Sequence, residues 1–203
     1  LRAEVQRDER DLYRDLCLSQ RGGYAAHLST GPFGVLSASP ELFFRIDDDR
    51  ITTRPMKGTA PRGRWPEEDE ENAGRLASSP KDRAENAMVV DLLRSDLGRI
   101  SVPGTVRANR LFETERYETV WQLTSTVRSA LRPGVSLSEA FRALFPSGSV
   151  TGAPKVSTMG LIAELEDAPR GPYCGAIGYL APPSSGEPRA NFNVAIRTVV
   201  RDR

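Results

Sequence analysis

The pattern of apolar and polar positions along the chain predicts a protein rich in strands, with a few sharply bounded helices. Runs of β-branched and aromatic residues bounded by Gly, Pro, Asn or Asp are typical of strands. Such runs occupy residues 23–28, 33–46, 51–56, 173–180 and 191–200. Two further segments are open: residues 116–131 are apolar enough to be buried as strand or helix, and residues 10–20 fit a short helix or an extended segment.

The clearest helix spans residues 80–97. Ser79 can cap it, Pro80 suits its first turn, and Gly98 ends it. Its apolar side is predicted to carry Met88, Val89, Leu92 and Leu93, with Glu85 on the same side.

Two further helices have clear starting signals. A capping box from Ser136 to Glu139 opens a helix that runs to Phe145. Another helix is predicted from Pro154 to about Glu166. The polar, proline-bounded stretch 61–80 is predicted as an exposed loop that can include a short helix. Because strands and helices come in runs and not in strict alternation, the order of elements favours an α+β fold.

The composition is that of an ordinary globular protein of 203 residues, with 38% hydrophobic and 27% charged residues. A net charge of +1 argues against nucleic acid or an anionic membrane as the main partner. No apolar run approaches the roughly 20 residues that span a bilayer. Cys17 and Cys174 are the only cysteines and stand far apart in the sequence, which indicates a reduced, cytoplasmic protein. His27 is the only histidine, so a histidine-rich metal site is excluded.

Lys57 stands in an unusual stretch, "TTRPMKGTAPRG" (residues 52–63), with prolines on both sides. Arg54, Arg62 and Arg64 add positive charge nearby. A basic surface loop is one explanation. A reactive amine held in a pocket is the other, because prolines fix the backbone around a side chain that is otherwise flexible.

Two glutamates are candidates for chemistry. Glu41 ends "SASPE", where small residues leave room for a ligand, although a surface glutamate is the plain alternative. Glu85 lies on the apolar side of a predicted helix, where an unpaired carboxylate is costly to bury. Lys81, four residues earlier, offers Glu85 an ordinary ion pair; a metal bound by such oxygen ligands would be Mg²⁺.

Several backbone features also suit a ligand. "SGSVTGAPK" (residues 147–155) exposes N–H groups at the start of a helix, which fits either an anion site or a tight structural turn. Its spacing is not that of a P-loop. Gly175, Ala176 and Gly178 allow close approach of a ligand or of another backbone. Arg197, predicted on a strand, either clamps a carboxylate or is solvated.

The order of these motifs is more specific than any one of them. The series reads "SASPE", "RPMKGTAPRG", "KDRAENAMVVDLLRSDLGR", "VWQLTSTVR", "FPSGSVTGAPK", "RGPYCGAIGYL" and "FNVAIRT". From about residue 30 to 200 it resembles the chorismate-utilising enzymes, which include anthranilate synthase component I, aminodeoxychorismate synthase component I and the isochorismate and salicylate synthases. The lysine of "PMKGT" is similar to that of aminodeoxychorismate synthases, whereas anthranilate synthases usually carry a small residue there.

The resemblance implies an anthranilate synthase component I-like fold, a layered sandwich of antiparallel sheets flanked by helices. It implies that Lys57 attacks chorismate at ring carbon C2 while the C4 hydroxyl departs, with Glu41 as the general acid. Ammonia would then add at C4 and expel the lysine, giving 4-amino-4-deoxychorismate on the route to 4-aminobenzoate and folate. An anthranilate synthase-like or isochorismate-type activity, or a non-catalytic chorismate-binding domain, is the alternative.

The resemblance also implies binding roles and partners. The residues implied to contact chorismate are Gly58, Thr59, Thr151, Gly152, Tyr173 and Arg197. Glu85 would help to hold Mg²⁺ on the ring carboxylate. A glutamine amidotransferase subunit or domain would supply the ammonia.

The chain also departs from the family. Gln122 stands where many relatives have histidine, Ser95 replaces a usual asparagine, and Gly160 replaces a common glutamate. Family members begin with a long strand-rich region and continue past "AIRT" into a glycine-rich segment and a helix with further Mg²⁺-binding carboxylates. Residues 1–203 are therefore expected to be the central part of a chorismate-binding catalytic domain, without those N-terminal and C-terminal parts, and inactive alone.

Overall fold

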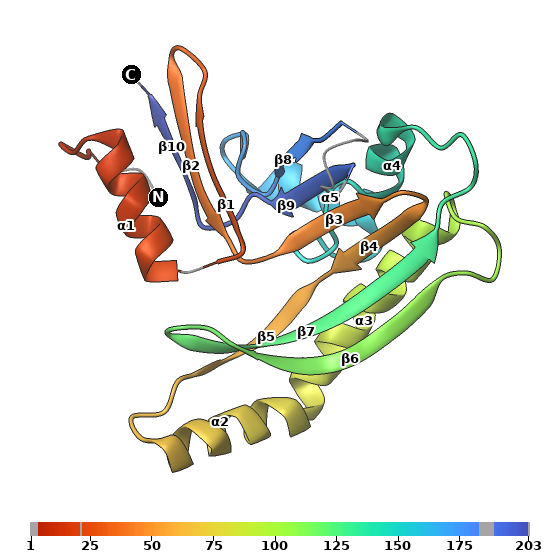
Figure 1. The fold of residues 1–203 in the computed structure, drawn as a ribbon, viewed down its shortest axis with the longest axis horizontal. Coiled ribbons are helices and arrows are strands. Elements are labelled where there is room, and N and C mark those ends of the chain that lie inside the picture. The colour runs from red at the N-terminus through yellow and green to blue at the C-terminus, as the bar shows by residue number, and fades with distance from the viewer. Residues whose placement is uncertain (1–3, 21, 183–188, 203) are drawn as a thin grey trace.

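The computed structural model describes residues 4–20, 22–182 and 189–202, which form two antiparallel sheets with helices packed against them (Figure 1). The smaller sheet has the order β1-β2-β10, and the larger has the order β5-β7-β4-β3-β9-β8, with β6 paired to β7. The strands are β1 (Tyr24–Ser29), β2 (Phe33–Ser39), β3 (Leu42–Asp47), β4 (Arg50–Arg54), β5 (Met56–Pro61), β6 (Arg107–Arg116), β7 (Val120–Ala130), β8 (Ala176–Leu180), β9 (Ala190–Val194) and β10 (Thr198–Asp202). The helices are α1 (Glu9–Gln20), α2 (Pro66–Ser78), α3 (Pro80–Gly98), α4 (Leu137–Leu144) and α5 (Lys155–Leu165). The layered α+β architecture expected from the sequence is confirmed.

Two of the predicted strands each divide between the two sheets. The run 33–46 breaks at Glu41 into β2 of the small sheet and β3 of the large one. The run 191–200 breaks after Val194 into β9 and β10 in the same way. A backbone hydrogen bond of 3.1 Å from the N–H of Val194 to the carbonyl of Glu41 joins the two breaks. The chain therefore crosses between the sheets twice, side by side, and Glu41 lies at the crossing.

The long strand β7 organises the other half of the large sheet. It pairs with β4 at one end, with β5 at the other, and with β6 along its opposite edge. The predicted strand 51–56 is interrupted at Pro55, so Lys57 lies on β5 and not in a loop. The sequence interpretation missed β6, whose pairing with β7 shifts register between Asn109 and Glu113.

Helix α3 matches its predicted bounds, and the Ser79 side chain accepts a hydrogen bond from the backbone N–H of Asp82. Its buried face differs from the predicted one, because Met88 is 47% exposed. The residues that α3 buries are Asn86, Val89, Val90, Leu93, Asp96 and Leu97. Two polar side chains thus lie on the inner face, while Glu85 lies at its flank.

The other helices divide into confirmed and missed elements. The capping box at Ser136 and Glu139 is present at the start of α4, and α5 begins after Pro154 as predicted. The stretch 61–80 was predicted as a loop that can include a short helix; it does contain a helix, but α2 fills most of it, so the predicted loop is wrong in extent. Among the described residues, no helix is long and apolar enough to cross a membrane.

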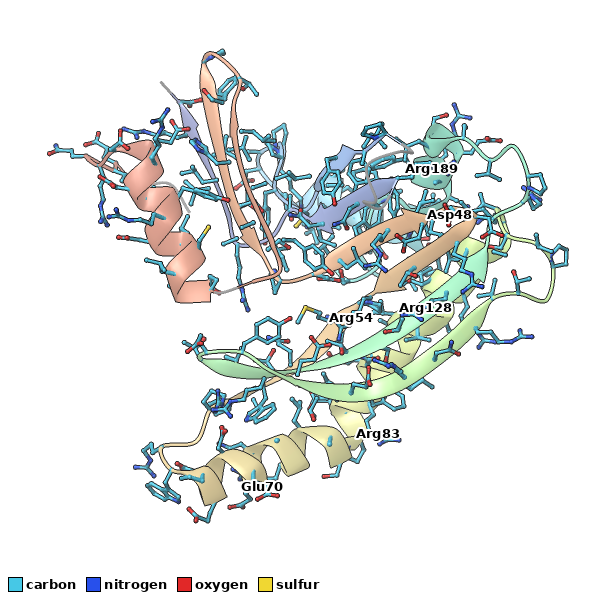
Figure 2. All side chains as sticks on the ribbon, in the orientation of Figure 1. Asp48, Arg54, Glu70, Arg83, Arg128 and Arg189 are labelled. Carbon is cyan, nitrogen blue, oxygen red and sulfur yellow. The ribbon has the colours of Figure 1, made fainter. Side chains whose placement is uncertain are left out.

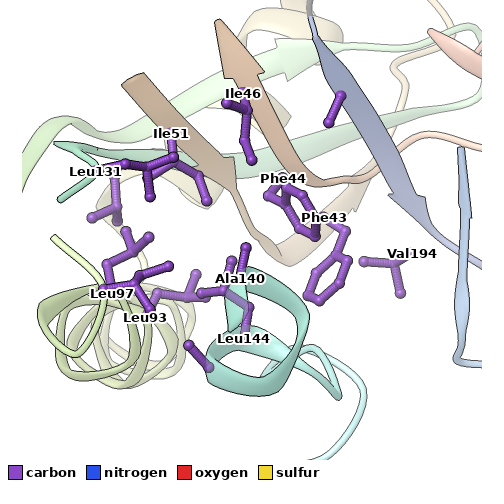
Figure 3. Packing of buried hydrophobic residues seen from close by; sticks show 14 of the residues in the cluster. Phe43, Phe44, Ile46, Ile51, Leu93, Leu97, Leu131, Ala140, Leu144 and Val194 are labelled. Carbon is purple, nitrogen blue, oxygen red and sulfur yellow. The ribbon is translucent and has the colours of Figure 1, made fainter. Parts of the chain in front are cut away.

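The main hydrophobic core lies between the large sheet and the helices α3 and α4 (Figure 3). Phe43 and Phe44 of β3 meet Leu93 and Leu97 of α3 and Leu144 of α4 within this cluster. Burying each such side chain contributes about 1.5–3 kcal/mol. This packing holds α3 against the sheet and so fixes the helix relative to β5, where Lys57 lies.

Candidate functional site

Glu41 is a buried carboxyl at the crossing between the two sheets. It is 3% exposed, and its Oε1 atom has no hydrogen-bond partner among the described residues. Burial raises the pKa of Glu41 to about 7, because desolvation disfavours the charged form. Three neighbours oppose the shift: the Ser149 hydroxyl, the backbone N–H of Met56 and the charge of Lys57. Near neutral pH, Glu41 is therefore a carboxyl that can hold or release a proton.

Lys57 approaches Glu41 from β5, at a bulge in the strand. The pairing of β5 with β7 shifts register between Met56 and Thr59, so Lys57 and Gly58 together face one residue of β7. Gly58 has a φ of +102°, and a Cβ atom at this position would lie 3.0 Å from the Cβ of Asp82. A bulge turns a side chain away from the direction that a regular ladder would give it. The local backbone thus sets where Lys57 points.

The three arginines near Lys57 in sequence are each bound to a carboxylate. Arg54, labelled in Figure 2, pairs with Glu115. The Arg62 guanidinium lies 2.6 Å from Asp69, and Arg64 lies 3.3 Å from Glu68. Because these charges are balanced locally, Lys57 is the cation of this stretch that acts on Glu41.

Thr59 and Gln122 are joined across β5 and β7. The Thr59 hydroxyl donates to the side-chain oxygen of Gln122 at 3.1 Å, and Gln122 is 8% exposed. The residue that stands in place of a histidine is therefore buried beside a predicted substrate contact.

The loop before α5 brings a third segment to Glu41 through Ser149. Within this loop the Thr151 hydroxyl donates to the carbonyl of Ser147 at 2.8 Å. Gly152 has a φ of +143°, which favours glycine. The Lys155 ammonium, 2.6 Å from the Asp96 carboxylate, ties the start of α5 to α3. Burial of both partners makes this ion pair a rigid anchor for the loop.

Tyr173 and Arg197 are not joined to Glu41 or Lys57 by any hydrogen bond or ion pair among the described residues. Tyr173 is 51% exposed. Arg197 was predicted on a strand, but it lies between β9 and β10, with a φ of +49°. Its guanidinium donates a hydrogen bond to the side-chain oxygen of Gln20 on α1 at 2.7 Å. A Cβ atom at Gly178 would lie 2.1 Å from the carbonyl of Asn191, so close backbone approach accounts for that glycine.

Glu85 is not brought into a metal site by the described residues. Its side chain is 42% exposed, and its carboxylate lies 4.0 Å from the Lys81 ammonium. No group of three or more His, Cys, Asp or Glu side chains within the described ranges is placed to hold a metal. Since Mg²⁺ is held by several oxygen ligands, Glu85 alone does not fit such a site. Cavities of about 670 and 890 Å³ lie against α4 and α1, and neither is lined by Glu41 or Lys57.

Known proteins resemble this chain in sequence and in fold. The model of the family described as chorismate binding enzyme matches residues 1–203. The chain belongs to this family. The sequence of this chain is 49% identical over 189 residues to an aminodeoxychorismate synthase of Streptomyces griseus, covering 93% of this chain and 26% of that protein. It is 44% identical over 191 residues to anthranilate synthase component 1 of Streptomyces coelicolor, covering 94% of this chain and 37% of the relative.

The fold of this chain agrees with that of a solved relative. Anthranilate synthase component I from Streptococcus pneumoniae superposes with a TM-score of 0.85 at 37% identity, over 98% of this chain and 42% of that one. The anthranilate synthase component I-like fold expected from the sequence is thereby confirmed. The chain spans less than half the length of each of these relatives, and relatives named for different products match it at similar identity.

Three polar residues of the candidate site could not be recognised from the sequence motifs. Ser149 lies in the motif that was interpreted through its backbone N–H groups, and its hydroxyl forms a hydrogen bond that lowers the pKa of Glu41. Gln122 was noted only as a departure. Asn86, next to Glu85 in sequence, is fully buried on α3 and was passed over. The sequence signal for Asn86 was a polar residue at helical spacing from the apolar residues Val89, Val90 and Leu93.

Proposed function

We propose that the complete protein aminates chorismate at C4, forming 4-amino-4-deoxychorismate from chorismate and ammonia. The observation that carries this proposal is the buried Glu41 carboxyl, with a pKa of about 7, beside the one lysine amine of β5. A protonated acid and a nucleophilic amine at one site match the two groups that the reaction requires. The 49% identity to an aminodeoxychorismate synthase supports the same product.

In the first step, the Lys57 ammonium first gives a proton to solvent, and the freed amine then forms a bond to C2 of the ring. The two ring double bonds shift, the bond from C4 to its hydroxyl breaks, and Glu41 gives its proton to that hydroxyl, which leaves as water. The products of this step are a lysine adduct with a positive nitrogen and an ionised Glu41. Burial and the adjacent cation suit Glu41 to both protonation states.

In the second step, ammonia bonds to C4 and the double bonds return. The bond from C2 to the lysine nitrogen breaks, and Lys57 leaves as the neutral amine. The new C4 ammonium gives one proton to the Glu41 carboxylate, which restores the acid for the next turnover. Proton and electron pairs therefore balance over the two steps within Lys57 and Glu41.

The substrate carboxylates need donors and cations, which we assign to the predicted binding residues. Gly58 and Thr59 adjoin Lys57 on β5, and Thr151 and Gly152 belong to the loop that carries Ser149. Tyr173 and Arg197 are proposed for the enolpyruvyl carboxylate. Glu85 would supply only one of the several oxygen ligands that Mg²⁺ takes, so the metal is proposed only with ligands from elsewhere in the complete protein, and no step is routed through it.

The ammonia is proposed to come from a glutamine amidotransferase partner. The relatives from Streptomyces coelicolor and Streptococcus pneumoniae are named component 1 and component I, which are the names of parts of larger assemblies.

The test is to identify the product. The complete protein is supplied with chorismate, an ammonium salt and Mg²⁺, and the products are separated by chromatography and identified by mass. The proposal predicts 4-amino-4-deoxychorismate. Anthranilate or isochorismate would establish one of the alternative activities, and unconsumed chorismate would establish a non-catalytic binding domain.

A further inference from the structure

The bulge at Lys57 interrupts the regular hydrogen bonding between β5 and β7. In the ladder, Met56 faces Thr124 and Thr59 faces Gln122, so two residues of β5 oppose Leu123 alone. A bulge of this kind disrupts the local ladder, and buried backbone carbonyls need other donors. The backbone carbonyls of Lys57 and Leu123 lie at this break in the pairing.

Asn86 of α3 supplies those donors. Its side-chain amide nitrogen donates to the carbonyl of Leu123 at 3.2 Å and to the carbonyl of Lys57 at 3.4 Å. Asn86 is 0% exposed, so its amide is shielded from water. One side chain therefore bridges the two strands at the residue where their pairing breaks.

The orientation of this amide is fixed by a second contact chain. The backbone N–H of Phe112 donates to the Ser125 hydroxyl at 3.1 Å, and that hydroxyl donates to the side-chain oxygen of Asn86 at 2.6 Å. Because the oxygen of Asn86 is engaged by Ser125, its NH₂ group faces Lys57 and Leu123. Ser125 is fully buried.

The same chain of contacts links two bulges. Phe112 lies in the bulge of β6, with a φ of +57°. Arg83, labelled in Figure 2 and one turn before Asn86 on α3, lies over the Phe112 ring at 4.5 Å. Helix α3 thus contacts the irregular point of β6 on one side and that of β5 on the other.

We propose that Asn86 is a positioning residue for Lys57, which holds the β5 bulge in the geometry that presents the amine to the substrate. The inference rests on the proposed function of Lys57 and deepens it. Asn86 touches neither substrate nor reacting atoms; it acts through the backbone of Lys57. Ser125 sets the orientation of the Asn86 amide.

The chain offers a matched control in Asn72. It is also a buried asparagine on a helix, and its amide donates at 3.2 Å to the carbonyl of Pro61, at the far end of the same strand β5. Asn72→Ala removes a comparable hydrogen bond without touching the bulge. It therefore reports the cost of losing a buried amide in general.

The first readout is a double-mutant cycle in the complete protein. Asn86→Ala is expected to lower kcat by about a hundredfold through misplacement of the amine, with the KM for chorismate little changed. In a Lys57→Ala background, Asn86→Ala is expected to cause no further loss, because its effect passes through Lys57. Asn72→Ala should leave kcat within about threefold of wild type.

The second readout does not need activity. Acetic anhydride labels the three lysines of this chain, and mass spectrometry of peptides gives each rate separately. Asn86→Ala and the milder Ser125→Ala should raise the labelling rate of Lys57 by about threefold or more, as the bulge opens more often. The rate of Lys81, which is exposed, should stay unchanged in every variant, and Asn72→Ala should alter neither rate.

The two readouts separate failure of the inference from failure of the function. If wild type forms no product but the labelling pattern appears, the proposed function is wrong and the positioning of Lys57 by Asn86 stands. The inference is overturned if product forms but Asn86→Ala lowers kcat by the same factor in the wild-type and Lys57→Ala backgrounds. It is also overturned if the labelling rate of Lys57 is the same in wild type and Asn86→Ala. In either case Asn86 has a structural role only.

Discussion

Glu41 shows how a single residue takes its chemistry from its place in the fold. The sequence left a surface glutamate as the plain alternative, and that alternative is wrong, because the chain crosses from one sheet to the other at this residue and buries it. Desolvation raises its pKa to about 7. A residue at such a crossing cannot be recognised from local pattern, since "SASPELFF" reads as one continuous strand.

The raised pKa predicts a specific dependence of stability on pH. Between the unfolded-state pKa and about 7, the folded state binds more protons at Glu41, so the free energy of unfolding falls as pH rises through this window and stays reduced above it. The shift corresponds to about 3 kcal/mol. Glu41→Gln, which keeps the shape and stays neutral, should match wild type near pH 4.5 and exceed its stability by about that amount near pH 8. Urea unfolding at the two pH values measures this, and a difference independent of pH would contradict it.

At the scale of elements, the bulge in β5 is what distinguishes the strand carrying Lys57 from an ordinary edge of the sheet. It depends on Gly58, whose φ is +102° and whose missing Cβ leaves room for Asp82 of α3. Helix α3 therefore packs against the bulge closely enough to constrain the residue there.

This close packing predicts opposite effects for two glycine substitutions. Gly58→Ala should destabilise the protein by about 1–3 kcal/mol, because the new side chain is strained at positive φ and meets Asp82 and Leu123. Gly74→Ala, in the interior of α2 with nothing within 4 Å of the new Cβ, should stabilise it by about 0.5–1 kcal/mol. Thermal unfolding of the two variants checks the pair; equal effects would show that the bulge tolerates a side chain.

The elements that the sequence predicted well were those with strong end signals. Helices α3 and α4 have capping side chains that are present as expected. The extent of helix α2 was missed because its first turn is acidic and polar and it buries only Asn72 and Leu76, which leaves little periodicity to detect. Strand β6 was missed because its bulge breaks the alternation on which strand prediction depends.

At the scale of the whole molecule, the candidate site gathers residues that are distant in sequence. Glu41, Lys57 and Ser149 come from a sheet crossing, a bulged strand and a loop before α5, and none is near another along the chain. The order of motifs predicted the family and, through the resemblance, that Glu41 and Lys57 act together, but it did not predict the contacts of Ser149 and Asn86. Those contacts depend on the pairing of β5 with β7 and on the packing of α3, both of which are tertiary.

The central claim is that Lys57 is the nucleophile in C4 amination of chorismate, and replacing this amine tests it most directly. Lys57→Ala and the control Lys81→Ala, which removes an exposed lysine, are compared with wild type in the complete protein, with chorismate, ammonia and Mg²⁺. The rate of 4-amino-4-deoxychorismate formation is followed by chromatography. We predict that Lys57→Ala lowers this rate by about a thousandfold or more, because the covalent step is lost, while Lys81→Ala keeps the wild-type rate. A Lys57→Ala protein that retained the full rate would contradict the account.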